Sequence, residues 1–209
     1  MDMVADFMGV AADCQHCGRQ HKVDVEQVFY GKDAVAELMQ ALITHAGWRR
    51  VAVVADGRTW GAAGAGVSAC ANAAGLTYEL LMVPDRPRDA DPVCDEETRD
   101  ELQARLGAVD GVLAVGSGVV NDLAKWMAWG AGLPYAVVAT AASMNGYASA
   151  NVATLVQGVK GLARAREAIM IASTPALLAE APARLTAAGL GDVVAKTVST
   201  TDWQVNHVL

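Results

Sequence analysis

Apolar residues recur along most of the chain in two alternating patterns. Between residues 33 and 46 they stand three and four positions apart, which is the spacing of an amphipathic helix, and Gly47 follows. Short apolar runs bounded by Gly, Pro or Asp predict buried strands at residues 51–55, 78–83, 112–115 and 135–139. Helical patterns separate them at residues 62–74, 96–106 and 120–128. This order predicts an α/β fold with a parallel, Rossmann-like sheet covered on both faces.

The pattern changes beyond Tyr147. Strand-like runs at residues 152–156 and 168–172 flank a turn rich in Gly and basic residues, and helical sequence follows from Ser173. We therefore expect an N-terminal lead-in over residues 1–24, an α/β domain over 25–172 and the beginning of an all-α domain over 173–209. The last helical pattern, from Asp192, reaches Leu209 without Gly, Pro or a cap, so we expect a truncated chain. Three prolines mark residues 84–95 as a solvated loop to which we assign no function.

Composition narrows the class of protein. With 53% hydrophobic and 19% charged residues, the chain has enough apolar sequence for a buried core. The formal net charge of −7 and the absence of a Lys/Arg cluster argue against nucleic acid as a partner. No signal peptide and no apolar stretch of membrane-spanning length is present, so we expect no membrane partner and a cytoplasmic location. Four cysteines are too few for a disulfide framework, and reduced thiols are the simplest interpretation.

A glycine-rich turn follows the strand predicted at residues 112–115. It reads Gly116, Ser117, Gly118, Val119, Val120 and leads into a helix, where free N–H groups and the helix dipole favour an anion. The motif G-x-G-x-x-N lacks the third glycine of the dinucleotide fingerprint, so a purely structural turn is the alternative. An earlier set, Gly61, Gly64 and Gly66, has the reversed spacing and is interpreted as structural, because the surrounding alanines suit close helix packing.

Cysteine and histidine gather near the N-terminus. Cys14, Cys17 and His21 have the spacing of half a zinc knuckle, but no second Cys pair follows. These residues could hold a metal only with a fourth ligand from elsewhere. The favoured interpretation is therefore reduced thiols in a flexible lead-in.

Two longer segments carry a family resemblance. The run GSGVVNDLAKWMAWGAGLPYAVVATAASMNGYASANVA and the later run PALLAEAPARLTAAGLGDVVAKTVSTTDW resemble the glycerol-1-phosphate dehydrogenases of the iron-alcohol-dehydrogenase and dehydroquinate-synthase superfamily. The blocks T-A-A-S-x-x-G and L-T-A-A-G-x-G-D are the specific parts, and the match extends from about Tyr30 to the C-terminus. The resemblance implies hydride transfer between NAD(P)H and dihydroxyacetone phosphate, giving sn-glycerol 1-phosphate.

The resemblance also implies where the cofactor lies. The glycine-rich loop would hold the pyrophosphate, and the block at residues 140–143 would line the nicotinamide side. Asp56, at the end of the first predicted strand, could accept from the adenosine ribose hydroxyls, although it could equally be a turn residue. The implied cofactor-binding residues are Asp56, Gly116, Ser117, Gly118, Val119, Val120, Thr140, Ala141, Ala142, Ser143 and Ser149.

Two residues are implied at the substrate. Asp192 matches the family's first metal ligand and would lie against the substrate; the ion is usually zinc and in some members nickel, and it polarises the carbonyl. The family supplies two further histidines downstream, so the metal site of this chain is expected to be incomplete. Asn145 stands where many members have Asp, and its amide brings no negative charge. Asn145 thus puts in doubt either the identity of the substrate or the activity itself. The alternative is that Asn145 only fills a tight turn before Gly146.

The principal expectation is a metal-dependent, NAD(P)-linked glycerol-1-phosphate dehydrogenase that acts on a small phosphorylated substrate. We expect this chain alone to be inactive and the full-length protein to be a homo-oligomer. A dehydroquinate-synthase-like lyase, which also binds NAD and a metal, is one alternative. A non-catalytic nucleotide-binding module is another.

Overall fold

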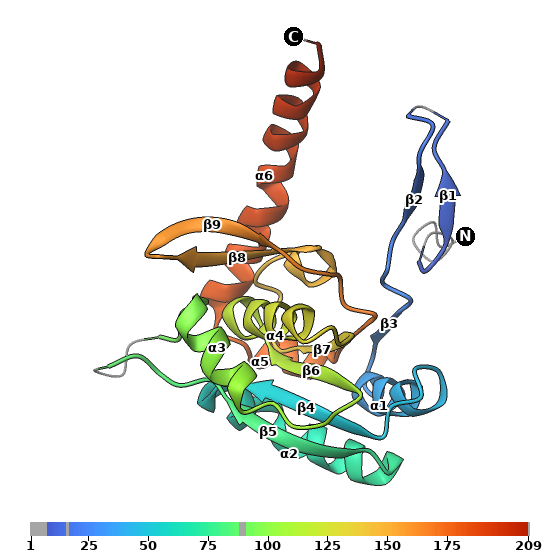
Figure 1. Cartoon of the computed structure of the whole chain (residues 1–209), viewed down its shortest axis with the longest axis vertical. Coiled ribbons are helices and arrows are strands. Elements are labelled where there is room, and N and C mark those ends of the chain that lie inside the picture. The colour runs from blue at the N-terminus through green and yellow to red at the C-terminus, as the bar shows by residue number, and fades with distance from the viewer. Residues whose placement is uncertain (1–7, 16, 88–90, 209) are drawn as a thin grey trace.

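A six-stranded parallel sheet forms the centre of the structure (Figure 1). The computed structural model describes residues 8–15, 17–87 and 91–208, so the expectations for residues 1–7, 16, 88–90 and 209 lie outside the described residues. In order across the sheet, the strands are β3 (Gln27–Tyr30), β10 (Met170–Ser173), β7 (Tyr135–Ala139), β6 (Gly111–Gly116), β4 (Arg50–Ala55) and β5 (Thr77–Met82). The predicted α/β fold and its parallel sheet are confirmed.

Both faces of the sheet are buried, which explains why its strands are apolar at consecutive positions. In β4, Val51 and Val53 pack on the side of α1 (Ala34–Thr44) and α2 (Gly57–Ala74), whereas Ala52 and Val54 pack on the other side. That second face is covered by α3 (Glu96–Ala104) and α4 (Gly118–Gly130). Figure 1 shows these two helical layers on either side of the sheet.

Helix α2 begins earlier than predicted, at Gly57 rather than at residue 62. The early turns are rich in Gly and carry no apolar stripe, so periodicity misses them. Their start is fixed instead by Asp56, whose side chain accepts from the backbone N–H of Thr59 at 2.7 Å. Gly61, Gly64 and Gly66 lie inside this helix, which agrees with their structural interpretation.

A separate antiparallel hairpin packs on α3 and α4. It consists of β8 (Asn151–Val156) and β9 (Val159–Arg164), and it follows a short 3-10 turn at Gly146–Ala148. The turn predicted over the Gly-rich and basic segment is confined to Gln157 and Gly158, because the residues that follow form β9. That strand is exposed along most of its length, so it needs no apolar pattern.

Helical structure follows β10, as expected. Helix α5 (Pro175–Glu180) is short, and α6 (Ala183–Val208) extends away from the sheet (Figure 1). The outer part of α6 leaves large apolar side chains exposed, among them Leu190, Val194 and Trp203. Among the described residues, no helix combines the length and the apolar character needed to cross a bilayer. The domain boundary near Ser173 stays a prediction.

The N-terminal lead-in contains regular structure. Strands β1 (Ala11–Asp13) and β2 (Gln20–Lys22) pair in antiparallel orientation and precede the edge strand β3. The sequence pattern did not predict this hairpin, and the flexibility of the lead-in stays a prediction.

Candidate functional site

A cleft opens between the carboxyl ends of β4 and β6. From β4 the chain crosses through α2 to β5 at one edge, and from β6 it crosses through α4 to β7 in the opposite direction. Open α/β sheets bind ligands where the crossover direction reverses in this way. The cleft has a volume of about 350 Å³, and its lining includes Asp56, Arg58, Ser117, Gly118, Val119, Val120, Thr140, Ala141, Ser143, Leu177, Arg184 and Leu185.

The glycine-rich turn forms the floor of this cleft. A Cβ atom on Gly116 would lie 2.5 Å from Cβ of Val120, so glycine is what allows β6 to approach the first turn of α4. A Cβ atom on Gly118 would instead meet nothing within 4 Å. Ser117 precedes the helix in an extended conformation and makes no side-chain cap, which leaves the first N–H groups of α4 free to bind an anion. The turn therefore fits a phosphate group.

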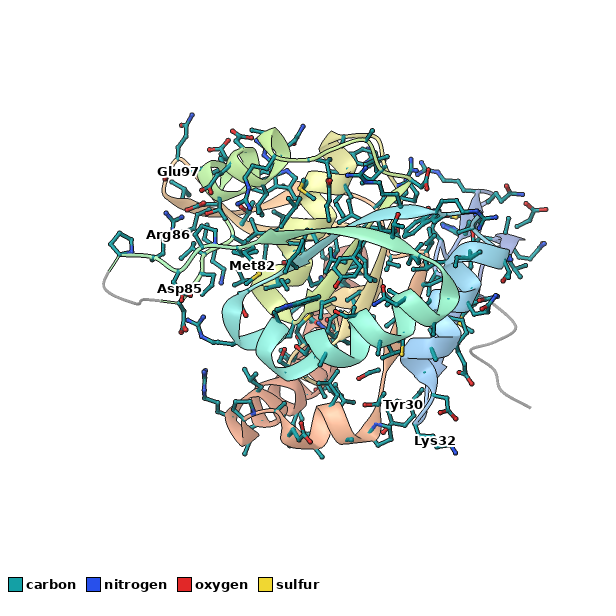
Figure 2. All side chains as sticks on the ribbon, turned by 90° about the horizontal axis from the view of Figure 1, so that it is seen from below. Tyr30, Lys32, Met82, Asp85, Arg86 and Glu97 are labelled. Carbon is teal, nitrogen blue, oxygen red and sulfur yellow. The ribbon has the colours of Figure 1, made fainter. Side chains whose placement is uncertain are left out.

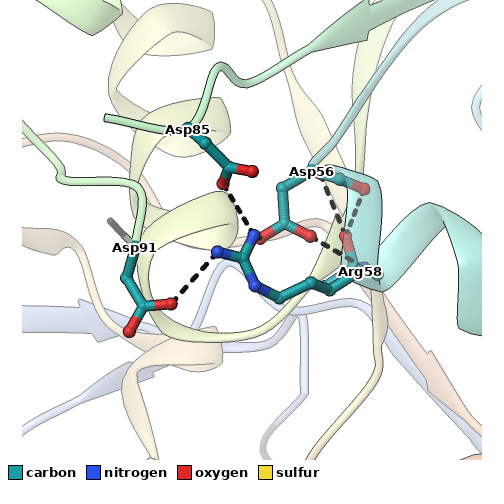
Figure 3. Close-up of polar contacts among 5 residues, drawn as sticks. Asp56, Arg58, Asp85 and Asp91 are labelled. Atoms are coloured by element: carbon teal, nitrogen blue, oxygen red, sulfur yellow. Dashed lines mark hydrogen bonds and ion pairs between the residues drawn. The ribbon is translucent and has the colours of Figure 1, made fainter. Parts of the chain in front are cut away.

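Asp56 and Arg58 line the rim of the cleft. Asp56 is the N-cap of α2, which gives it a structural role, and the same side chain also lines the cleft. The Arg58 guanidinium lies 2.7 Å from Asp85 and 3.1 Å from Asp91, and 4.0 Å from Asp56 (Figure 3). The hydrogen bond to Asp85 contributes most to raising the pKa of Arg58. One fixed cation thus stands beside three carboxylates.

The loop predicted at residues 84–95 supplies part of this rim. Figure 2 shows Asp85 and Arg86 just beyond Met82, the last residue of β5. Arg86 is paired with Asp95, the N-cap of α3, and lies 3.6 Å from Glu97. These ion pairs tie the loop to the start of α3, and Pro92 lines the cleft. Nothing in the sequence pattern predicted that this loop would border the cleft.

The block at residues 140–143 crosses from the cleft to α6. Thr140 donates its backbone N–H to the carbonyl of Gly116 at 3.1 Å, and Thr140, Ala141 and Ser143 line the cleft. Ala142 is not among the residues that line the cleft, and its backbone lies against α6 instead. A Cβ atom on Gly189 of α6 would overlap the carbonyl oxygen of Ala142 and lie 2.9 Å from the carbonyl carbon of Ala142. Gly189 therefore lets α6 pack directly on this block.

A second cleft of about 640 Å³ adjoins the first and shares Pro92, Gly118, Val119 and Ser143 with it. It brings together Asn145, Ser149 and Asp192. The backbone N–H of Asn145 donates to Oδ2 of Asp192 at 2.8 Å, and Lys196 Nζ lies 3.3 Å from Oδ1. The hydrogen bond from Asn145, followed by the bond and charge of Lys196, lowers the pKa of Asp192. Two predicted substrate residues from distant segments thus meet at one site.

The residues around Asp192 do not by themselves form a metal site. Catalytic zinc is commonly held by three protein ligands. Within residues 8–15, 17–87 and 91–208, the one cluster of three Cys, His, Asp or Glu ligand atoms is at Cys14, Cys17 and His21, not at Asp192. The expectation that further metal ligands lie outside this chain therefore stays a prediction.

Sequence reasoning missed Lys125, which holds both ends of the loop that carries Ser149. Its ammonium is buried on α4 and donates to the carbonyls of Gly146 at 2.7 Å and Asn151 at 3.1 Å. It also lies 3.5 Å from Asp122. Burial lowers the pKa of Lys125 and raises that of Asp122, and their mutual attraction opposes both shifts. The one signal in the sequence is a lone cation in a mostly apolar helical run, three residues after Asp122.

The sheet order, the glycine turn and the cleft above it define an open α/β domain of the doubly wound class. The model of the iron-containing alcohol dehydrogenase family matches residues 30–182. The chain belongs to this family.

Similar proteins include glycerol-1-phosphate dehydrogenases. The NAD(P)+ glycerol-1-phosphate dehydrogenase of Geobacillus stearothermophilus is 31% identical over 97% of this chain and 50% of its own length. That of Halalkalibacterium halodurans is 30% identical over 96% of this chain and 50% of its own length. The chain therefore spans about half the length of these relatives.

Solved structures show the same fold. An alcohol dehydrogenase from Oenococcus oeni superposes with a TM-score of 0.70 at 18% identity, over 83% of this chain and 51% of that one. A glycerol dehydrogenase from Schizosaccharomyces pombe gives 0.69 at 19% identity, over 83% of this chain and 43% of that one.

The first prediction concerns Lys125. Lys125→Met should lower the free energy of unfolding by about 3–5 kcal/mol, because it leaves Asp122 and two carbonyls buried without their cation. Urea denaturation measures this change. Lys196→Met is the matched control: its side chain is 51% exposed, and an exposed pair contributes about 0–1 kcal/mol. Equal losses in the two variants would show that Lys125 does not hold the loop.

Proposed function

We propose that the cleft between β4 and β6 binds NAD(P)(H) and that the whole protein is a glycerol-1-phosphate dehydrogenase. The observation that carries the proposal is the free N-terminus of α4, opening at Gly118 onto a cleft at the switch point of the sheet. The names of the similar proteins support the reaction.

The cofactor would lie across the first cleft. The N–H groups at residues 118–120 would bind the pyrophosphate, because the helix start combines free donors with a partial positive charge. Asp56 could accept from a ribose hydroxyl, whereas the cation of Arg58 could meet a 2′-phosphate. Both groups stand at the same rim, so we propose that the site accepts NAD and NADP. Thr140, Ala141 and Ser143 would then face the nicotinamide half.

The substrate would lie in the second cleft. When bound, the nicotinamide ring supplies or accepts the hydride, and the shared wall at Gly118, Val119 and Ser143 would bring the ring next to this cleft. Asn145 and Asp192 offer polar contacts for the hydroxyl and carbonyl groups of dihydroxyacetone phosphate. Lys160 of β9 also lines this cleft and could pair with the phosphate of the substrate.

A metal ion is proposed for the whole protein only. Asp192 would be one of its ligands, with zinc or nickel as the ion implied by the resemblance, and we assign no step to the ion here. A homo-oligomer and a cytoplasmic location also stay predictions.

The second prediction tests the cofactor site. Gly118→Val should weaken NADH binding by at least about tenfold, equivalent to about 1.4 kcal/mol, because the branched side chain would project into the cleft. The backbone tolerates the change, since Gly118 is not among the positive-φ glycines. Fluorescence titration with NADH measures the affinity.

Gly66→Val is the matched control for this titration. Gly66 is also a helical glycine whose added Cβ meets nothing within 4 Å, but it lies on the exposed side of α2. This variant should bind NADH like the parent. Equal NADH affinities for the parent, Gly118→Val and Gly66→Val would show that the glycine turn does not contribute to the binding site.

The third prediction tests the reaction. The 209-residue chain should not oxidise NADH with dihydroxyacetone phosphate, even with added zinc or nickel, because Asp192 alone is a poor anchor for such an ion. A longer chain that includes the two expected downstream histidines should turn over, and stereospecific analysis should find sn-glycerol 1-phosphate. Metal-dependent turnover by the 209-residue chain would show that the ligands are misplaced. Inactivity of a folded, metal-loaded longer chain would contradict the proposed reaction.

A further inference from the structure

Two backbone hydrogen bonds join the ends of the segment between β1 and β2. Cys14 N–H donates to the carbonyl of Arg19 at 2.8 Å, and Gly18 N–H donates to the carbonyl of Cys14 at 2.9 Å. Gly18 has a φ of +66°, a left-handed conformation that glycine adopts without strain. The turn therefore brings Cys17 back over the start of the loop.

The hairpin register adds a histidine to this turn. His21 lies in β2 opposite Ala12, four residues after Cys17. Its Nε2 atom is 3.0 Å from Sγ of Cys17. The ligand atoms of Cys14, Cys17 and His21 all lie within 4.8 Å of one another. Three residues with metal-binding side chains thus converge on one point.

This spacing suits a tetrahedral metal ion. Zinc bonds of about 2.3 Å to sulfur and about 2.0 Å to nitrogen place neighbouring ligand atoms roughly 3.5–3.8 Å apart. The observed separations, 3.0 Å between Cys17 Sγ and His21 Nε2 and at most 4.8 Å for the other pairs, bracket these values. Two thiolates and an imidazole favour zinc over magnesium or calcium, which prefer oxygen ligands.

We propose that Cys14, Cys17 and His21 form a zinc site that is distinct from the dehydrogenase site. The three side chains supply three ligands, and the fourth position is open to water or another small ligand. Binding converts the two thiols to thiolates and releases their protons. The ion fastens the β1–β2 hairpin, which precedes the edge strand β3 (Figure 1).

The fourth prediction is tested with Zn²⁺ and the 209-residue protein, kept reduced by a phosphine. In competition with a chromogenic chelator, the parent should bind one equivalent of zinc at this site. Cys14→Ser/Cys17→Ser and His21→Ala should each weaken that binding by at least roughly tenfold. Cobalt substitution should give a thiolate-to-metal charge-transfer band in the parent, and the double variant should lack it.

Two controls separate this site from others. Cys70→Ser removes a thiol of α2 outside the cluster, and Asp192→Asn removes the candidate ligand in the second cleft; both should keep the parent's zinc affinity. Circular dichroism should show the hairpin variants folded, because the hairpin side chains lie outside the two core clusters, and it also checks the fold of Cys70→Ser, since Cys70 packs against the first cluster. Zinc binding that survives Cys14→Ser/Cys17→Ser, or that is lost in Asp192→Asn, would overturn the proposal.

Discussion

The close contact between Gly116 and Val120 is the constraint on which the candidate site depends. Because residue 116 has no side chain, β6 runs directly into the first turn of α4, and the start of that helix faces the cleft. A longer side chain would push the helix from the strand. A hydrogen bond from the neighbouring strand also holds this turn, because the backbone N–H of Thr140, which follows β7, donates to the carbonyl of Gly116. One glycine thus sets the positions of the two segments that form the floor and wall of the cleft.

Helix α4 also organises the second cleft. Lys125 lies two turns beyond Gly118 and holds the carbonyls on both sides of the loop that carries Ser149. Tyr147 strengthens the arrangement by donating its hydroxyl to the carbonyl of Ala141 at 2.8 Å. A buried ammonium costs several kcal/mol of desolvation, and here a carboxylate and two carbonyls offset that cost. The polar site therefore depends on a rigid helix rather than on the loop alone.

The sequence predicted the buried parts of the sheet well, for a physical reason. Strands β4, β6 and β7 are covered on both faces, so their apolar runs are continuous. Strand β3 was missed because it is a short edge strand with alternating exposure, and β9 because it is largely exposed. The start of α2 depends on one capping carboxylate rather than on periodicity.

The site could be predicted only in part. The glycine turn and the resemblance placed residues 116–120, 140–143 and 192 near one another, but they gave no indication of Arg58, Lys125 or the loop at residues 84–95. Those contributions depend on tertiary contacts between segments far apart in sequence, such as the bonds from Arg58 to Asp85 and Asp91. A lysine or arginine in sequence is usually a solvated residue, so its burial or pairing becomes visible only in the fold.

The proposed site requires that the pyrophosphate of NAD(P)(H) bind at the first turn of α4. Residue-resolved amide hydrogen exchange, measured with and without saturating NADH, can detect this contact. The amides of Gly118, Val119 and Val120 have no acceptors within the helix, so they should exchange rapidly in the free protein and slowly in the complex. Protection confined to other segments, with these three amides unchanged, would contradict the account.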